Sequence, residues 1–158
     1  MSTLIGSGDL EPDAYGNDQL NHHNDFVYLS DEGKRSAPDG FGTRIIAHQL
    51  EGARRLGVEN IDTYGIGQYT APGEVPHSNG YSTWPKMGFN GNLEPKHIAA
   101  LPPQFRSART THELFRMPGG LNAWNRYGSD IDLNFDPNPN SVHSRLFAKY
   151  LQKKNIVP

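Results

Sequence analysis

The sequence contains no cysteine, which excludes disulfide bonds, thiolate nucleophiles and cysteine metal ligands. It also lacks any run near the roughly 18 apolar residues of a membrane span, and its first residues lack the basic and apolar stretches of a signal peptide. A basic excess is missing too, since 15 Lys and Arg stand against 17 Asp and Glu. We therefore expect no membrane partner and no nucleic-acid partner, and a cytoplasmic or assembled-particle location.

Hydrophobic residues are scarce as well, at 35% of the 158 positions, with a mean hydropathy of −0.69. Glycine and proline are frequent, with 17 and 12 copies. The length suits about one domain with a modest core and many loops. No Gly-x-Ser-x-Gly elbow, Walker loop or His-Glu-x-x-His motif occurs, which argues against the common hydrolase, nucleotidase and zinc-protease classes.

The clearest local pattern is a glycine turn, Gly40-Phe41-Gly42, that leads into an amphipathic helix ending before Gly57. The residues on its expected inner side recur every three or four positions: Ile45, Ile46, Gln49, Leu50, Ala53 and Leu56. The start of a helix carries unpaired backbone N–H groups and the positive end of the helix dipole, so the turn could hold a phosphate or another anion. Glycines also form plain turns, and this simpler interpretation stays open.

Two strands are expected to flank this helix, at 25–30 and 58–64, which would make one βαβ unit. Residues 1–24 show no periodicity and are predicted to be an extended N-terminal arm, followed by one domain over 25–158. An arm of this kind frays unless the fold or a neighbouring chain holds it, which favours a homo-oligomer or a larger assembly.

The rest of the chain predicts short helices and one further strand. A helical turn is expected over 79–89, and helices over 94–101, 111–117 (capped by Thr110 or Thr111), 120–127 and, after the cap Ser141, 142–154. Residues 129–136 alternate between apolar and polar, which predicts a strand with one buried face. The expected fold class is therefore α/β or α+β, with a mixed sheet and flanking helices.

Metal ligation and aromatic stacking have weaker signals. His22, His23 and Asp25 cluster locally, but adjacent strand residues point to opposite faces and cannot chelate together. The alternating polar residues Asp130, Asp132 and Asn134 could offer oxygens to a hard cation or act as a base, although a solvated strand face explains them as well. Trp84 and Trp124 could stack a ligand, or could simply pack in the core.

Gly40-Phe41-Gly42-Thr43 with its helix, and the later Asn79-Gly80-Tyr81 with Trp84-Pro85-Lys86-Met87-Gly88-Phe89, resemble the GNAT acyltransferase superfamily. The match is nearest to a divergent GNAT-like group found as a module in bacteriophage head-associated and large bacterial proteins, to which His23-Asn24-Asp25 is also similar. The resemblance implies a partial GNAT sheet with a reduced amino-terminal half.

The same resemblance implies a ligand, acetyl-CoA or another acyl-CoA, and a site. Its pyrophosphate would lie on the turn formed by Gly40, Phe41, Gly42, Thr43 and Arg44, and Asn79 and Trp84 would lie beside the pantetheine arm. Trp84 stands where the family commonly has a proton-donating tyrosine, and an indole N–H has no usable acidity near neutral pH. Tyr81 is then the candidate catalytic acid for N-acyl transfer.

A second function stays open beside the first. The short stretch before residue 25, the exchange at Trp84, and Ala37 in place of the family's Gln or Arg all favour a domain retained as a scaffold. In this alternative the protein is a non-catalytic structural or interaction component of a larger assembly, such as a bacteriophage virion.

Overall fold

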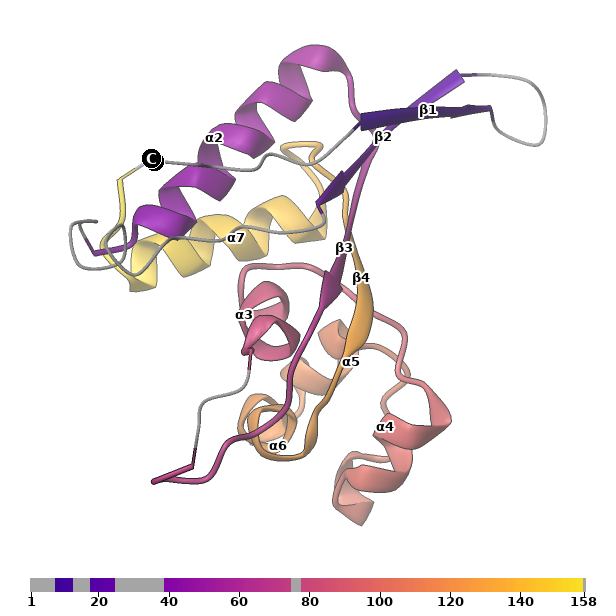
Figure 1. Cartoon of the computed structure of the whole chain (residues 1–158), viewed down its shortest axis with the longest axis vertical. Helices are drawn as coiled ribbons and strands as arrows, with labels where there is room; N and C mark the ends of the chain where they lie inside the picture. Colours follow the sequence, from indigo (N-terminus) through magenta and orange to yellow (C-terminus); the bar gives the residue numbers. More distant parts are fainter. Residues whose placement is uncertain (1–7, 13–17, 25–38, 75–77, 158) are drawn as a thin grey trace. The chain divides into compact units, whose positions relative to one another are not determined.

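The computed structural model describes residues 8–12, 18–24, 39–74 and 78–157. The chain divides into two compact units, the first drawn from Met1–Asp62 and Asp136–Pro158 and the second from Thr63–Phe135. The described strands are β1 (Gly8–Pro12), β2 (Asp18–Asn24), β3 (Asn60–Gly65) and β4 (Ile131–Phe135) (Figure 1). The described helices are α2 (Phe41–Leu56), α3 (Gly80–Lys86), α4 (Pro95–Ala100), α5 (Thr111–Arg116), α6 (Gly120–Tyr127) and α7 (Val142–Lys153), with a short 3-10 helix, η1 (Pro103–Phe105).

This mixture of helices and strands agrees with the expected α+β class. The finer expectation of a partial GNAT sheet, and the domain boundary after residue 24, stay predictions. The expected strand at 25–30, and with it the expected βαβ unit, lies outside the described residues.

In the first unit, part of the expected N-terminal arm forms a strand pair. β1 and β2 are antiparallel, with Leu10 opposite Leu20. This pairing is not predicted by the sequence pattern, because Gly, Asp and Asn break up the apolar alternation by which strands are recognised.

Helix α2 confirms the prediction of a helix that follows the glycine turn and ends before Gly57. Gly40, with φ of 77°, precedes its first residue, and Gly57, with φ of 73°, ends it by donating its N–H to the carbonyls of Ala53 and Arg54. Its buried residues are Ile46, Ala47, Leu50 and Ala53. Leu56, which was expected on the inner side, is 74% exposed because the helix ends there and its last turn faces solvent.

Helix α7 begins as the sequence predicts, with the Ser141 side chain accepting a hydrogen bond from the Ser144 N–H. Phe147 is its main buried anchor. The aliphatic Val142 is 37% exposed in the first turn.

The second unit is built from short helices around β4, whose residues alternate between buried and exposed as the pattern predicts. Phe89 lies between two other rings, with centroids 5.1 Å from Trp84 and 4.9 Å from Phe135. Trp124, from α6, is fully buried, and its indole N–H donates to the Tyr81 carbonyl oxygen at 2.8 Å. The packing interpretation of Trp124 is thereby confirmed.

Several helix ends of this unit also follow the sequence. Thr110 caps α5 by accepting a hydrogen bond from the Glu113 N–H, which decides between the two expected caps. Glu94 precedes α4, and Pro95 occupies its first position, where a missing N–H costs nothing.

A matched pair of glycine substitutions tests this packing. A Cβ on Gly120 would lie 1.8 Å from the Leu114 carbonyl oxygen, whereas a Cβ on Gly52 would meet nothing within 4 Å. We expect Gly120→Ala to lower the free energy of unfolding by at least about 2 kcal/mol. Gly52→Ala should raise it by about 0.5 to 1 kcal/mol, because Ala is the better residue in a helix interior. Urea unfolding measures both, and a neutral Gly120→Ala would contradict the packing described.

Candidate functional site

The predicted anion site at the start of α2 is partly covered by the end of the chain. A Cβ on Gly40 would lie 2.8 Å from Cδ1 of Ile156, so the Ile156 side chain packs directly on this glycine. The Arg44 guanidinium donates a hydrogen bond to the Val157 carbonyl oxygen at 2.5 Å. The sequence analysis did not foresee this contact, since it joins residues 113 positions apart.

The other side of the same turn is open. No described atom lies within 4 Å of the position that a Cβ on Gly42 would take. The backbone N–H groups of Phe41, Gly42 and Thr43 find no acceptor within the part of the chain that the structure describes, as is usual for the first turn of a helix. All of these residues are half-buried. The turn therefore keeps free donors on one side and an apolar plug on the other.

The remaining predicted residues belong to the second unit, on α3. Asn79 precedes the helix, and its carbonyl oxygen accepts hydrogen bonds from the Ser82 and Thr83 N–H groups. Trp84 is half-buried and meets Phe89 edge to face. These residues belong to the second unit and the α2 turn belongs to the first, so a cofactor site that they share stays a prediction.

Tyr81, the candidate acid, is buried with 4% of its surface exposed. Its hydroxyl donates to the Asn125 carbonyl oxygen at 2.7 Å, so its proton already has an acceptor within the fold. Burial raises the pKa of this phenol above its ordinary value of 10.0, which makes it a weaker acid. This geometry suits a structural hydrogen bond between α3 and α6 better than proton delivery to a bound thiolate.

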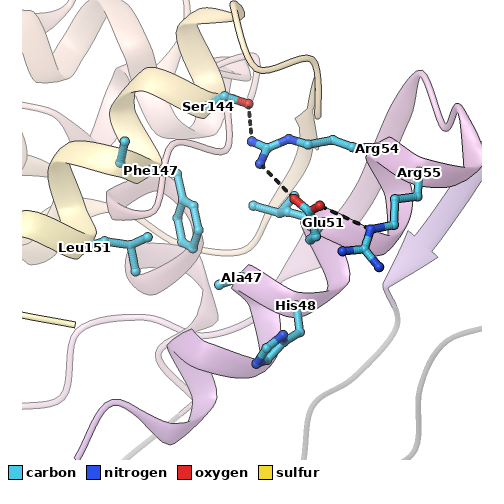
Figure 2. Close-up of a pocket in the computed structure, with 10 residues that line it drawn as sticks. Ala47, His48, Glu51, Arg54, Arg55, Ser144, Phe147 and Leu151 are labelled. Carbon is cyan, nitrogen blue, oxygen red and sulfur yellow. Dashed lines mark hydrogen bonds and ion pairs between the residues drawn. The ribbon is translucent and has the colours of Figure 1, made fainter. Parts of the chain in front are cut away.

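A second candidate site, which the sequence analysis missed, is a groove between α2 and α7 with a volume of about 430 Å³ (Figure 2). Its lining combines apolar and charged side chains from the two helices: Ala47, His48, Leu50, Glu51, Arg54 and Arg55 from α2, and Ser144, Phe147, Ala148 and Leu151 from α7. The sequence predicts both helices, the first of them as amphipathic. The local patterns do not show that these two helices, about 90 residues apart in the chain, contribute apolar side chains to one groove.

Arg54 holds one end of this groove. Its Nε donates to the Pro137 carbonyl oxygen at 2.7 Å, and its Nη2 donates to the Ser144 hydroxyl at 3.0 Å. Its Nη1 lies 3.9 Å from Glu51, whose other carboxylate oxygen is 3.2 Å from Nε of Arg55. Figure 2 shows the contacts of Arg54 with Ser144 and Glu51 and that of Glu51 with Arg55, with Phe147 and Leu151 to their left.

Charge is distributed very unevenly between these helices and the rest of the chain. Together α2 and α7 contain six Lys or Arg and a single Glu, whereas the remaining residues contain nine Lys or Arg and sixteen Asp or Glu. The total of −2 hides this separation. The groove therefore lies between two basic helices on an otherwise acidic chain.

The polar strand residues behave as ordinary surface and turn groups. Asp130 accepts a hydrogen bond from the Gly67 N–H at 2.5 Å, and Asp132 is exposed. Within the described ranges, no group of three His, Asp or Glu side chains is placed to hold a metal ion. Among the helices described, none is long and apolar enough to cross a membrane.

Comparisons with known protein families, with curated protein sequences and with solved structures found no match for this chain. The GNAT-like resemblance therefore stays a prediction that rests on the quoted motifs.

The role of Tyr81 can be tested by removing its hydroxyl. We expect Tyr81→Phe to lower the free energy of unfolding by about 1 to 2 kcal/mol, because the Asn125 carbonyl loses its donor in a buried environment. Tyr127→Phe is the matched control, since Tyr127 is 46% exposed and should change stability by less than about 0.5 kcal/mol. Urea unfolding followed by circular dichroism measures both. Equal, small effects would refute the structural role.

Proposed function

We propose that the protein is a non-catalytic structural component that assembles with further copies of itself through the groove between α2 and α7. The single observation that carries this proposal is the groove itself, which combines an apolar lining with Arg54 and Arg55 and lies between two helices of net positive charge on a chain whose remainder is acidic. Virion or cytoplasmic location and the identity of any larger assembly follow only as predictions from the resemblance.

The apolar lining of the groove provides the kind of contact that contributes most to binding affinity. Phe147 and Leu50 are buried at its base, and Leu151 lies half-exposed along its side. Apolar pockets of this kind take a projecting side chain or a short amphipathic segment from a partner. Phe147 and Leu50 are already closed to water, so the apolar surface that a partner can cover belongs to Leu151 and the exposed Ala148. Removing such surface from water is the main favourable term in association.

The exposed basic residues of α2 and α7 determine which kind of partner is favoured. Arg55 is exposed on the rim, and Arg145, Lys149 and Lys153 are exposed on α7. An acidic segment would meet these residues favourably, and sixteen of the seventeen acidic residues lie outside the two helices. A second copy of the same chain therefore offers the complementary charge. Because the two complementary surfaces differ, the contact is head-to-tail and builds rings or filaments.

Catalysis has less support than assembly. The candidate acid Tyr81 is engaged with Asn125, and Ile156 occupies the space above Gly40. A working acyltransferase would need both an acid or an alternative proton route and a clear path to the turn.

Binding of an acyl-CoA without transfer is a second candidate, favoured by one observation. The N–H groups of Phe41, Gly42 and Thr43 have no acceptor among the residues described, and the space beside Gly42 is open. Arg44 lies next to them and could exchange its contact with the Val157 carbonyl for a phosphate oxygen.

The assembly proposal is tested by sedimentation of the full chain at low and high salt. We expect concentration-dependent oligomers whose dissociation constant rises steeply with salt, because the complementary charges are exposed and are screened. Ala148→Glu should weaken association at least about tenfold, since Ala148 is exposed and lines the groove.

Ala99→Glu is the matched control for this test. It makes the same substitution at an exposed helical position on α4, outside the two basic helices and the groove. It should leave the dissociation constant within about twofold of the parent. A parent that stays monomeric at high concentration and low salt, or two variants with equal effects, would overturn the proposed interface.

The second candidate is tested by titration with CoA, followed by amide NMR. Binding at the turn should move the resonances of Phe41, Gly42 and Thr43, and Arg44→Gln should weaken it several-fold, because a charge-assisted hydrogen bond is lost. Arg145→Gln, an exposed arginine of α7, is the control. If about 1 mM CoA moves none of these resonances, the binding free energy is weaker than about −4 kcal/mol, and this candidate is ruled out.

A further inference from the structure

A buried histidine in the second unit is used by neither proposed function. His97, in α4, has 1% of its surface exposed. Among the described residues, it is the only side chain in the buried class that titrates near neutral pH. Its ring lies edge-on to the Trp124 indole, with centroids 5.3 Å apart and planes at 64°.

Both ring nitrogens of His97 have backbone partners. The Glu94 N–H donates to Nδ1 at 3.0 Å, and Nε2 lies 2.9 Å from the Asp130 carbonyl oxygen. Because an N–H can only donate and a carbonyl can only accept, the hydrogen-bond network assigns the proton to Nε2 and leaves Nδ1 bare. The neutral ring therefore joins the first turn of α4 to the residue that precedes β4.

Protonation would break this arrangement. A second proton on Nδ1 would face the Glu94 N–H, so one hydrogen bond would be replaced by two opposed donors. The new charge would also be buried beside Trp124. Helix α4 spans only Pro95–Ala100, too short to be stable without such tertiary contacts.

The charged groups around His97 do not provide a compensating buried partner. Lys96 opposes protonation, while the Glu94 and Asp130 carboxylates favour it. Glu94 is exposed and paired with Lys96 at 3.2 Å, and Asp130 receives the Gly67 N–H. At the far end of α4, Arg106 donates to the Leu101 and Ala99 carbonyls and so holds that end in place.

We propose that His97 is an acid-sensitive latch that fastens the first turn of α4 over Trp124 and releases it when the ring takes a second proton. The release is local, because the Arg106 contacts at the other end of α4 do not involve the imidazole. The surface uncovered includes the indole of Trp124.

Burial lowers the pKa of His97 in the folded chain below the ordinary value of 6.5, and this sets the direction of the effect. The opened state binds a proton more readily than the closed state, so the latch is fully stabilising above about pH 6.5 and weakens as the pH falls toward the folded pKa. Over that window the equilibrium constant for opening should rise about tenfold per pH unit.

Trp124 fluorescence reports the opening directly. The chain has two tryptophans, so a Trp84→Phe background leaves Trp124 as the sole tryptophan, which excitation at the red edge of the absorption band selects over the tyrosines. Between about pH 8 and about pH 5, we expect its emission to shift to longer wavelength and its quenching by acrylamide to increase. His97→Gln should abolish the transition, because glutamine serves at this position of a helix start as an acceptor for the Glu94 N–H and does not titrate.

Two further histidines serve as controls. His48→Gln changes an exposed residue and should leave the transition unchanged. His112 is partly buried, its Nε2 lies 2.9 Å from the Gly88 carbonyl oxygen, and burial also lowers its pKa, with Arg116 nearby. A transition that disappears in His112→Gln and persists in His97→Gln would overturn the assignment.

A measurement on the unsubstituted chain covers the case in which His97→Gln fails to fold. The imidazole resonances of His97, followed by NMR, should show the Nε2–H form at neutral pH and a titration below the ordinary value of 6.5. Titration at or above that value, or unchanged Trp124 quenching across the range, would refute the latch.

Discussion

The guanidinium of Arg54 is the contact on which the candidate interface depends. It reaches from α2 to the Pro137 carbonyl and the Ser144 hydroxyl, and so ties the last turns of α2 to the first turn of α7. Its planar fork donates to both partners at once, which a lysine could not do with the same geometry. Hydrogen bonds from a charged donor are typically worth about 1.5 to 3 kcal/mol each. With one end of the two helices held in this way, Phe147 packs against a surface of constant shape, and the groove exists before any partner arrives.

In the second unit, neutral side chains donate the hydrogen bonds that hold short elements together. Its α-helices span six to eight residues, too short to be stable alone, and side chains of α3, α4 and α6 donate to backbone carbonyls elsewhere in the unit. Tyr81 donates to Asn125, Trp124 donates to Tyr81, and His97 donates to Asp130. Such buried bonds favour one arrangement of the chain, because a buried carbonyl that loses its donor finds no water molecule to take the donor's place. Of these three donors only the imidazole of His97 changes its protonation near neutral pH, so acid acts on this bond and not on the other two.

Local features were largely predictable from the sequence, and features that depend on long-range contacts were not. The limits of α2, the caps at Thr110 and Ser141 and the alternation of β4 follow from short patterns whose physical causes lie within a few residues. The Ile156 side chain over Gly40 and the groove between α2 and α7 join segments about 90 or more residues apart, and no periodicity encodes such a pairing. Tyr81 shows the same limit, because its motif position suggested an acid while its burial gives it a structural bond.

Whole-chain charge was the most misleading of the sequence measures. A total of −2 predicts a surface without a strong preference, yet α2 and α7 carry six Lys or Arg against one Glu, and two of these residues, Arg54 and Arg55, line the groove. Charge alone would leave two kinds of acidic partner open, a phosphate backbone or an acidic protein segment. The apolar lining of the groove favours the protein, because phosphate contacts are made by exposed basic and polar groups and gain nothing from the accessible Leu151 and Ala148. An interface that combines an apolar centre with a charged rim is instead the usual arrangement between protein surfaces, where the centre supplies affinity and the rim supplies orientation.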